Sequence, residues 1–313
     1  MKVSILGVGF IGRQLLESYL NKGCEISILD HKSCPDKYKP FVNWEKADFT
    51  NLKTLRQVIK KSDVVYHLIS STVPADNVDE NEEIMKNVSQ TINLLKLCVD
   101  ENVKKIIFMS SSSVYGIQKK TPISEMALTD PISSHGIHKL TIEKYIQLYK
   151  YQYGLDCKIV RLSNPYGMGQ NIFGRQGIIA ISIGKIVLGK PIVIHGNGEA
   201  IRDFIHIDDV INACHLIAES MSNEIVFNVG SGIGLSINVL LNELQEFSSC
   251  KINIEYVHNR ANDILESVLD ISKAQNILNF NPGTTIKEGL YKSLVDYSKK
   301  IPELNDYFNV VRL

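Results

Sequence analysis

Residues that can move a proton lie close together in the middle of the chain. His135 and Lys139 are four residues apart, so a helix would carry both on one face, and a run of serines (110–113) lies upstream. An imidazole has an ordinary pKa of about 6.5 and is therefore a general base near neutral pH. A neighbouring lysine disfavours a second positive charge and keeps such an imidazole neutral. The pattern indicates proton transfer in this region.

A glycine-rich turn near the start of the chain indicates a nucleotide site. Gly7, Gly9 and Gly12 form a G-x-G-x-x-G pattern between a strand-like segment and a helix-like segment. Such glycines allow the backbone to approach a pyrophosphate, which the N–H groups of the following helix bind. Asp30 ends the next strand-like segment, where an acidic side chain binds the adenosine ribose and repels a 2′-phosphate. We therefore expect NAD rather than NADP. The cofactor-binding residues predicted in the turn are Gly7, Gly9, Phe10, Ile11 and Gly12.

Short apolar segments alternate with helical patterns through the first half of the chain. The predicted strands are 3–6, 25–29, 64–69, 105–109 and 158–162. The predicted helices are 11–21, 52–60, 82–100 and 136–153. This alternation predicts an α/β fold with a doubly wound parallel sheet. Beyond residue 162 the rhythm loosens and glycines and asparagines become frequent, which favours a smaller C-terminal α/β domain.

Composition excludes several classes of function. Lys and Arg number 34, as do Asp and Glu, so the chain has no net charge to attract nucleic acid or an acidic membrane. No run of 18 apolar residues occurs, and the chain starts directly with a strand-like segment, so we expect neither a spanning helix nor a signal peptide. The six cysteines lack metal-ligand spacing and are typical of reduced thiols, so we expect a cytoplasmic protein without a metal site. There is no G-x-S-x-G elbow and no P-loop.

Motifs over nearly the whole chain resemble those of the extended short-chain dehydrogenase/reductases, a group that contains the NAD-dependent nucleotide-sugar epimerases and dehydratases. Residues 110–116 (SSSSVYG) and 139–143 are similar to the catalytic strand end and helix of that group. Residues 47–49 (ADF) are similar to its adenine contact, and residues 63–70 (DVVYHLIS) to its D-x-V-x-H-L-A strand beneath the cofactor.

The resemblance implies further cofactor contacts. Asp48 would contact the adenine amino group, Leu68 would lie beneath the cofactor, and Lys139 would hold the nicotinamide ribose. We expect His67, in the same strand as Leu68, to be a packed and hydrogen-bonded residue rather than a catalyst.

Segments in the second half resemble the substrate-binding part of the same group. Residues 161–167 match R-x-x-N-x-Y-G, and residues 196–204 match G-x-G-x-x-x-R-D-F. The resemblance implies that Asn164 contacts the diphosphate of a nucleoside-diphosphate sugar and that Arg202 and Arg260 bind its phosphates. Paired arginines suit a diphosphate because the guanidinium group stays charged and binds in a bidentate way.

Position 135 departs from the family pattern. The family has a tyrosine there, which exchanges a proton with the substrate, and a serine or threonine at Ser111 (or at Ser112, if the alignment slips) that binds the substrate hydroxyl. We predict Ser111, His135 and Lys139 as catalytic residues, with His135 as the general base. Two alternatives stay open: His135 is inert, or His138 performs the same task.

The resemblance also implies an organisation of the chain. We expect residues 1–165, with a returning segment at about 205–232, to form an NAD-binding Rossmann domain, and residues 166–313 to form mainly the substrate-binding domain. Helices 82–100 and 136–153 are rich in apolar residues and are expected to pair in a homodimer or a higher oligomer.

The implied function is NAD-dependent oxidation of a ring carbon, C4, in a nucleoside-diphosphate sugar. A dehydratase usually has Asp-Glu after the active hydroxyl residue, whereas this chain has Ser112-Ser113, so a 4-epimerase or a 4-dehydrogenase is expected. The alternative is a non-catalytic protein that binds NAD and a nucleotide sugar and has lost the tyrosine.

Overall fold

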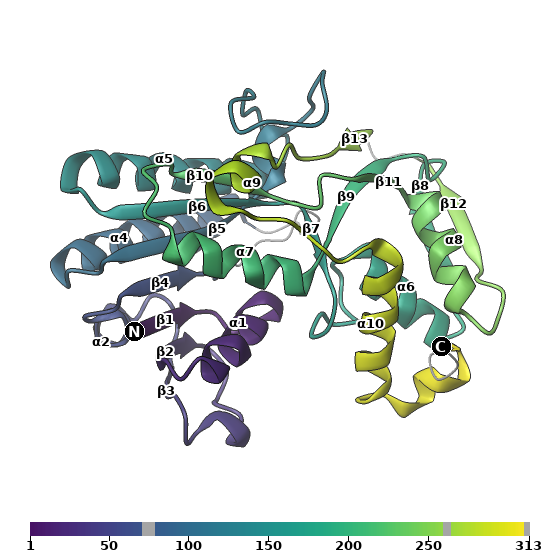
Figure 1. Cartoon of the computed structure of the whole chain (residues 1–313), viewed down its shortest axis with the longest axis horizontal. Helices are drawn as coiled ribbons and strands as arrows, with labels where there is room; N and C mark the ends of the chain where they lie inside the picture. The colour runs from purple at the N-terminus through teal and green to yellow at the C-terminus, as the bar shows by residue number, and fades with distance from the viewer. Residues whose placement is uncertain (71–78, 259–263, 310–313) are drawn as a thin grey trace.

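The computed structural model describes residues 1–70, 79–258 and 264–309. Its larger part is built on a seven-stranded parallel sheet with the order β10-β6-β5-β4-β1-β2-β3 (Figure 1). The chain starts in the middle of the sheet and adds strands outwards in both directions, which confirms the predicted doubly wound fold. The strands are β1 (Lys2–Leu6), β2 (Glu25–Asp30), β3 (Asn43–Lys46), β4 (Val64–His67), β5 (Lys105–Ser111), β6 (Asp156–Leu162) and β10 (Val226–Val229).

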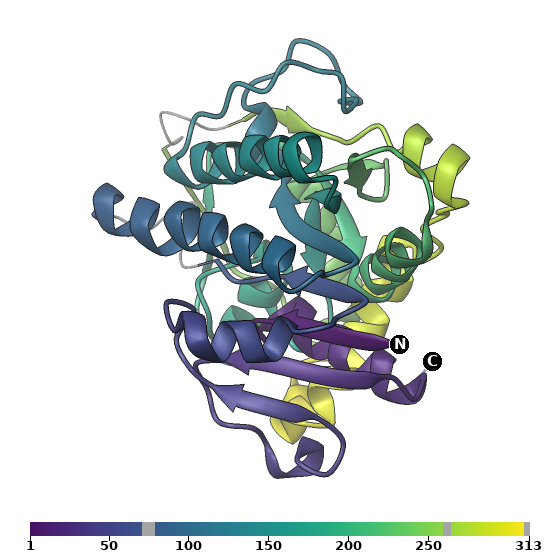
Figure 2. The same ribbon diagram turned by 90° about the vertical axis from the view of Figure 1, so that its left-hand side faces the viewer.

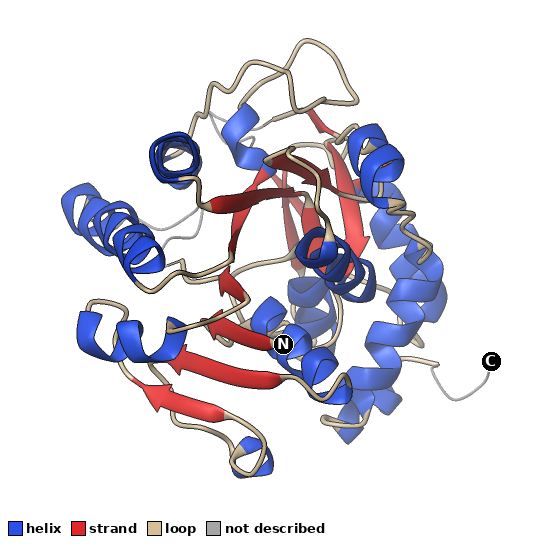
Figure 3. Ribbon diagram, turned by 60° about the vertical axis from the view of Figure 1, so that its left-hand side comes forward, coloured by secondary structure: helices blue, strands red, loops and turns tan. Residues whose placement is uncertain are grey.

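Helices cover both faces of this sheet (Figures 2 and 3). Ile5 and Ile107 point to the face covered by α1 and α7, whereas Leu6 and Phe108 point to the other face. Because strand side chains alternate between faces, the inner strands must be apolar on both, which explains their largely apolar sequences. The helices are α1 (Phe10–Asn21) and α7 (Ile207–Glu219) on one face, and α2 (Leu52–Ile59), α4 (Gln90–Asp100) and α5 (Ser134–Tyr153) on the other.

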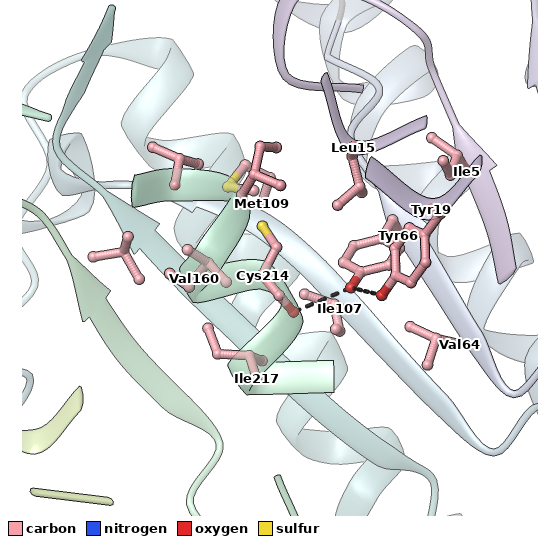
Figure 4. Packing of buried hydrophobic residues seen from close by; sticks show 14 of the residues in the cluster. Ile5, Leu15, Tyr19, Val64, Tyr66, Ile107, Met109, Val160, Cys214 and Ile217 are labelled. Atoms are coloured by element: carbon pink, nitrogen blue, oxygen red, sulfur yellow. Dashed lines mark hydrogen bonds between the residues drawn. The ribbon is translucent and has the colours of Figure 1, made fainter. Parts of the chain in front are cut away.

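A chain of hydrogen bonds crosses the apolar core beneath α1. The hydroxyls of Tyr19 and Tyr66 lie 2.7 Å apart, and Tyr66 donates to the Cys214 carbonyl at 3.1 Å (Figure 4). Tyr19 therefore donates to Tyr66, and both phenols are satisfied although they are buried.

A second apolar cluster lies in the C-terminal part of the chain. Small sheets and helices surround it, and β9 pairs with β7, β11 and β13. The strands are β7 (Asn164–Tyr166), β8 (Ile192–His195), β9 (Ile201–His206), β11 (Gly234–Ser236), β12 (Ile254–Val257) and β13 (Glu266–Ser267). The helices around this cluster are α6 (Ile178–Val187), α8 (Ile237–Phe247) and α10 (Ile286–Ser298), whereas α9 (Ser272–Leu278) packs against β10 of the large sheet.

The structure differs from the sequence-based expectation at two elements. Strand β3 was not predicted, because this edge strand is partly exposed and has no apolar run. The predicted helix 82–100 is divided into α3 (Glu80–Glu83), a π-helical turn (Ile84–Ser89) and α4. Within it, Asn87 Nδ2 donates to the Glu83 carbonyl at 2.9 Å, and Thr91 Oγ1 donates to the Asn87 carbonyl at 2.6 Å. Side chains that bond to helix carbonyls in this way favour such irregular turns.

Within the described residues, no helix combines the length and the apolar character that crossing a membrane requires.

Candidate active site

The glycine turn lies at the carboxyl end of β1 and leads into α1. Gly7 has a φ of +93°, and a Cβ on Gly12 would lie 2.1 Å from the Gly7 carbonyl oxygen, so neither position accepts a side chain without a shift of the backbone. A Cβ on Gly9 would meet nothing within 4 Å, and no side chain caps the start of α1. The first N–H groups of α1 therefore face an open space that suits a pyrophosphate.

Asp30 is held beside this turn by backbone groups. Its Oδ2 accepts a hydrogen bond from Val8 N at 2.6 Å, and its Oδ1 accepts one from Lys32 N at 2.7 Å. Leu68 lies next to the turn as well, 3.2 Å from the position of a Cβ on Gly12. Asp48 is exposed just after β3, where hydrogen bonds from Thr50 lower the pKa of its carboxyl group.

The N-terminus of α5 packs against the serine run at the end of β5. Ser111 is the last residue of β5, and its Oγ accepts a hydrogen bond from Ser113 N at 3.1 Å. A Cβ on Gly136 would lie only 2.6 Å from the Ser113 carbonyl oxygen, so the glycine permits this close approach. His135, the second residue of α5, is half-buried next to this contact.

Lys139 is buried beneath the same edge of the sheet. Its Nζ donates to the Met109 carbonyl at 2.8 Å and lies 4.6 Å from the centre of the Phe108 ring. Burial lowers the pKa of Lys139 to about 8, although Glu143 opposes this shift. Lys139 follows His135 by one turn of α5, the helix that begins beside the serine run.

His67 is packed and hydrogen-bonded, as expected for a strand residue. Its Nε2 lies 2.8 Å from Thr91 Oγ1, and its ring packs against Phe49 and Phe108. Burial, and secondarily the charge of Lys139, lower the pKa of His67 to about 3, so this imidazole stays neutral.

A buried ion pair joins β5, α5 and β6 below the site. Glu143 and Arg161 are connected by hydrogen bonds of 3.2 Å from Nε and 2.7 Å from Nη2, and Ser110 Oγ donates to Glu143 Oε1 at 2.5 Å. The guanidinium group of Arg161 lies 4.8 Å from the centre of the Tyr115 ring, and Tyr115 donates to Asn228 Oδ1 at 2.6 Å. Every member is buried, so this cluster fixes the strand end against α5.

A second buried contact, between a glutamate and a histidine, lies one turn along α5 from His135. Glu83 Oε2 of α3 is 3.6 Å from His138 Nδ1, and both side chains are buried. This distance exceeds that of a hydrogen bond, and Nδ1 has no hydrogen-bond partner within the described part of the chain.

Two of the three residues expected to bind the substrate diphosphate lie near each other. Asn164 Nδ2 donates to the Asp203 carbonyl at 2.9 Å, and Arg202 precedes Asp203 in β9 and donates to the Ile201 carbonyl at 2.9 Å. Asp203 accepts from Ser231 N at 2.7 Å, which fixes the strand. Arg260, the third, lies outside the described residues.

A cleft of about 1010 Å³ opens at the ends of β8 and β12, beside the start of β9. Its volume is in the range of ligand pockets, and aromatic and polar side chains line it. The lining residues include His195, Asn197, Glu199, Ile201, Tyr256 and His258.

The sequence analysis assigned no role to Glu83, matched Glu143 only as part of the motif at residues 139–143, and interpreted Asn228 as a structural residue. A signal for the first was present, because Glu83, Asn87 and Thr91 are polar residues spaced by four in a segment that packs on the sheet. Within the described residues, no group of three or more His, Cys, Asp or Glu side chains is placed to hold a metal ion.

Fold and site together define a dinucleotide-binding α/β protein of the doubly wound class. The family model described as the NAD dependent epimerase/dehydratase family matches residues 3–230. The chain belongs to this family, within the extended short-chain dehydrogenase/reductases, and NAD is the family's cofactor.

Curated relatives cover most of the chain. A putative UDP-glucose 4-epimerase of Methanocaldococcus jannaschii is 33% identical over 303 residues, which are 94% of this chain and 96% of that protein. A dTDP-4-dehydro-6-deoxyglucose reductase of Escherichia coli is 30% identical over 302 residues, 91% of this chain and 94% of that protein.

Solved structures show the same fold. The UDP-glucose 4-epimerase of Thermotoga maritima with UDP-glucose superposes with a TM-score of 0.89 at 28% identity, covering 96% of this chain and 100% of that one. The UDP-glucuronic acid 4-epimerase of Bacillus cereus, in complex with UDP-glucuronic acid and NAD, has a TM-score of 0.85 at 27% identity and the same coverage.

Proposed function

We propose that this protein is a nucleoside-diphosphate-sugar 4-epimerase in which His135 replaces the family's tyrosine as proton acceptor. The observation that supports the proposal is the close approach of Gly136, at the start of α5, to Ser113, because His135 precedes Gly136 in the chain and Lys139 follows one turn later in α5. The relatives support position 4 of the sugar, because both the 4-epimerase and the 4-dehydro sugar reductase are named for that carbon.

In this proposal the bound NAD supplies the hydride acceptor. The diphosphate of the substrate binds Asn164, Arg202 and Arg260, and the sugar reaches towards the end of β5. Ser111 hydrogen-bonds the C4 hydroxyl, and a ring nitrogen of His135 takes the hydroxyl proton as the carbon is oxidised. Lys139 keeps His135 neutral beforehand, so that the imidazole can accept that proton.

A panel of nucleoside-diphosphate sugars tests the activity. Interconversion of the two C4 epimers without net change of NAD would support the 4-epimerase. Release of a keto sugar with formation of NADH would instead identify a 4-dehydrogenase. The missing tyrosine favours one further candidate, a non-catalytic binding protein, which would bind NAD and nucleotide sugar without converting any member of the panel.

The substrate class predicts a ligand effect on stability. A nucleoside diphosphate at millimolar concentration should raise the melting temperature, because a ligand that binds only the native state stabilises it. Arg202→Ala should reduce this shift by removing a charge-assisted contact, while Lys190→Ala, a change of the same charge at an exposed position, should leave it unchanged. Absence of protection by every nucleoside diphosphate would contradict the substrate class.

Cofactor preference should depend on Asp30. The unmodified protein should bind NAD(H) and reject NADP(H), because the carboxylate repels a 2′-phosphate. Asp30→Ala should reduce the difference between the affinities for NADH and NADPH, measured by fluorescence titration. Equal affinities of the unmodified protein for both would refute the role of Asp30.

We also infer that the protein forms a cytoplasmic homodimer through α4 and α5. Large apolar side chains are exposed on the π-helical turn before α4 and on α5, among them Ile84, Met85, Leu148 and Tyr151. Sedimentation measurements test this inference.

We further assign residues 1–165, with about 205–232, to an NAD-binding domain and 166–313 mainly to substrate binding, which the position of β10 in the large sheet supports.

A further inference from the structure

Two side chains of α5 hold consecutive residues of β5. Lys139 Nζ donates a hydrogen bond to the Met109 carbonyl at 2.8 Å, and Glu143, one turn later, accepts one from Ser110 Oγ at 2.5 Å. The next residue, Ser111, ends the strand. In the proposed function Ser111 binds the substrate hydroxyl, so these two hydrogen bonds set the position of that serine relative to α5.

The carboxylate of Glu143 is buried among cations. Its side chain is 0% exposed, and Arg161 Nη2 donates to its Oε2 at 2.7 Å. Lys139, 7% exposed, precedes it by four residues, a spacing at which the Cβ atoms of a helix are about 5–6 Å apart. The hydrogen bond of Lys139 goes to a carbonyl group, which carries no charge, and a buried ammonium group needs a negative charge nearby to stay protonated.

Glu143 supplies that charge, whereas the neighbouring histidines and Arg161 cannot. Burial lowers the pKa of Lys139 to about 8, and the negative charge of Glu143 acts against this shift. Burial and the charge of Lys139 lower the pKa of His67, on β4, to about 3, so that imidazole is neutral. His135, one turn before Lys139 on α5, is neutral or cationic, and Arg161 of β6 is a cation.

We propose that Glu143 is a positioning residue of the active site with two tasks. Through Ser110 it fixes the end of β5 at Ser111, and its carboxylate is the counter-charge of Lys139. Glu143 does not touch the substrate, and it exchanges no proton or electron in the reaction. The counter-charge follows from the buried cluster alone, whereas the effect on turnover rests on the proposed function.

The titration of Lys139 tests the counter-charge without any turnover. Its ε-methylene resonance is followed in ligand-free protein that contains isotope-labelled lysine, and is assigned by its loss in Lys139→Met. Glu143→Gln keeps an oxygen that accepts from Ser110 but removes the charge, so it should lower the titration midpoint from about 8. A unit charge about 6–8 Å away at an effective dielectric constant of about 20–40 corresponds to a fall of about 0.8–2 pH units. A merely structural role predicts the opposite sign, because a loosened strand end would admit water to Lys139 and raise its midpoint towards 10.5.

Ser110→Ala is the matched control and tests the first task. It removes the hydrogen bond from β5 but leaves the charge of Glu143, so the midpoint of Lys139 should change by less than about 0.3 pH units. Turnover should nevertheless fall about 3- to 30-fold in kcat, with KM changed less than about threefold, because a displaced Ser111 aligns the reacting hydroxyl poorly. In Glu143→Gln the loss of turnover at alkaline pH should begin at a lower pH, together with the midpoint of Lys139.

An equal or higher midpoint of Lys139 in a folded, NAD-binding Glu143→Gln protein would overturn the counter-charge. Unchanged turnover in Ser110→Ala would overturn the positional task. If Glu143→Gln does not fold, Glu143→Gln/Arg161→Met repeats the titration without an unpaired guanidinium group. It should still lower the midpoint, since the charge that acts most on Lys139 is that of Glu143. If the unmodified protein converts no nucleotide sugar, the proposed function fails, whereas the midpoints still decide whether Glu143 is the counter-charge.

Discussion

Replacement of His135 by alanine is expected to lower kcat by about 10²–10⁴-fold while NAD still binds. Loss of a positioned proton acceptor has an effect of this size, and the alanine leaves the glycine turn and Asp30 untouched. The measurement is steady-state turnover of the sugar that the panel identifies, together with titration of NAD.

The pH dependence gives the same test a second readout. Turnover of the unmodified enzyme should rise as the imidazole loses its proton, with a midpoint at or below about 6.5 because Lys139 and the start of α5 disfavour the cation. It should fall again as the pH passes about 8, where Lys139, which we expect to hold the nicotinamide ribose, loses its charge. In His135→Ala the rising limb should be absent.

Two further substitutions serve as controls for His135→Ala. His135→Phe keeps an aromatic ring without a proton acceptor and should be equally slow. His135→Tyr restores the residue of the family and retains activity if the pocket accommodates the longer side chain. Turnover and a pH profile of His135→Ala like those of the unmodified enzyme would refute the general base and direct attention to His138 or to a bound water.

Arg161→Met is expected to lower the free energy of unfolding by about 3–5 kcal/mol. The substitution leaves the carboxylate of Glu143 buried without its cationic partner, and breaking a buried pair from one side has a cost of this order. Urea denaturation followed by circular dichroism measures the change.

The double variant Glu143→Gln/Arg161→Met should recover much of this loss, since it removes the unpaired charge as well. Arg56→Met is the matched control, because Arg56 forms ion pairs with Asp100 and Glu101 but lies at the surface. Its effect on the free energy of unfolding should be much smaller than that of Arg161→Met, because solvent screens an exposed ion pair. An Arg161→Met protein that unfolds at the same urea concentration as the unmodified one would show that the cluster contributes nothing to stability.

The fold and the cofactor were predictable because their signals are local. The first thirty residues contain the glycine turn, the strand before it and Asp30. The alternation of strands and helices predicts the doubly wound sheet. The order of the motifs also indicated Asn164 and Arg202 as residues that bind the substrate diphosphate. The structure brings these two residues close together.

The interior contacts of the site were not predictable from local patterns. Glu83 meets His138 across 55 positions of sequence, and Tyr115 meets Asn228 across 113. Nothing in the periodicity of either segment specifies the partner in the other. The π-helical turn depends on side-chain hydrogen bonds to backbone carbonyls, which a pattern of apolar residues does not record.

The polar edge strand β3 has a consequence for the behaviour of the protein in concentrated solution. The edge of a sheet exposes backbone groups that can pair with a strand of another molecule and start aggregation. β3 is only four residues long, and Asn43 and Lys46 at its ends are exposed. A short strand with a charged terminus is a poor template for such pairing. The polar composition that made β3 difficult to predict thus also protects this edge of the sheet against pairing with another molecule.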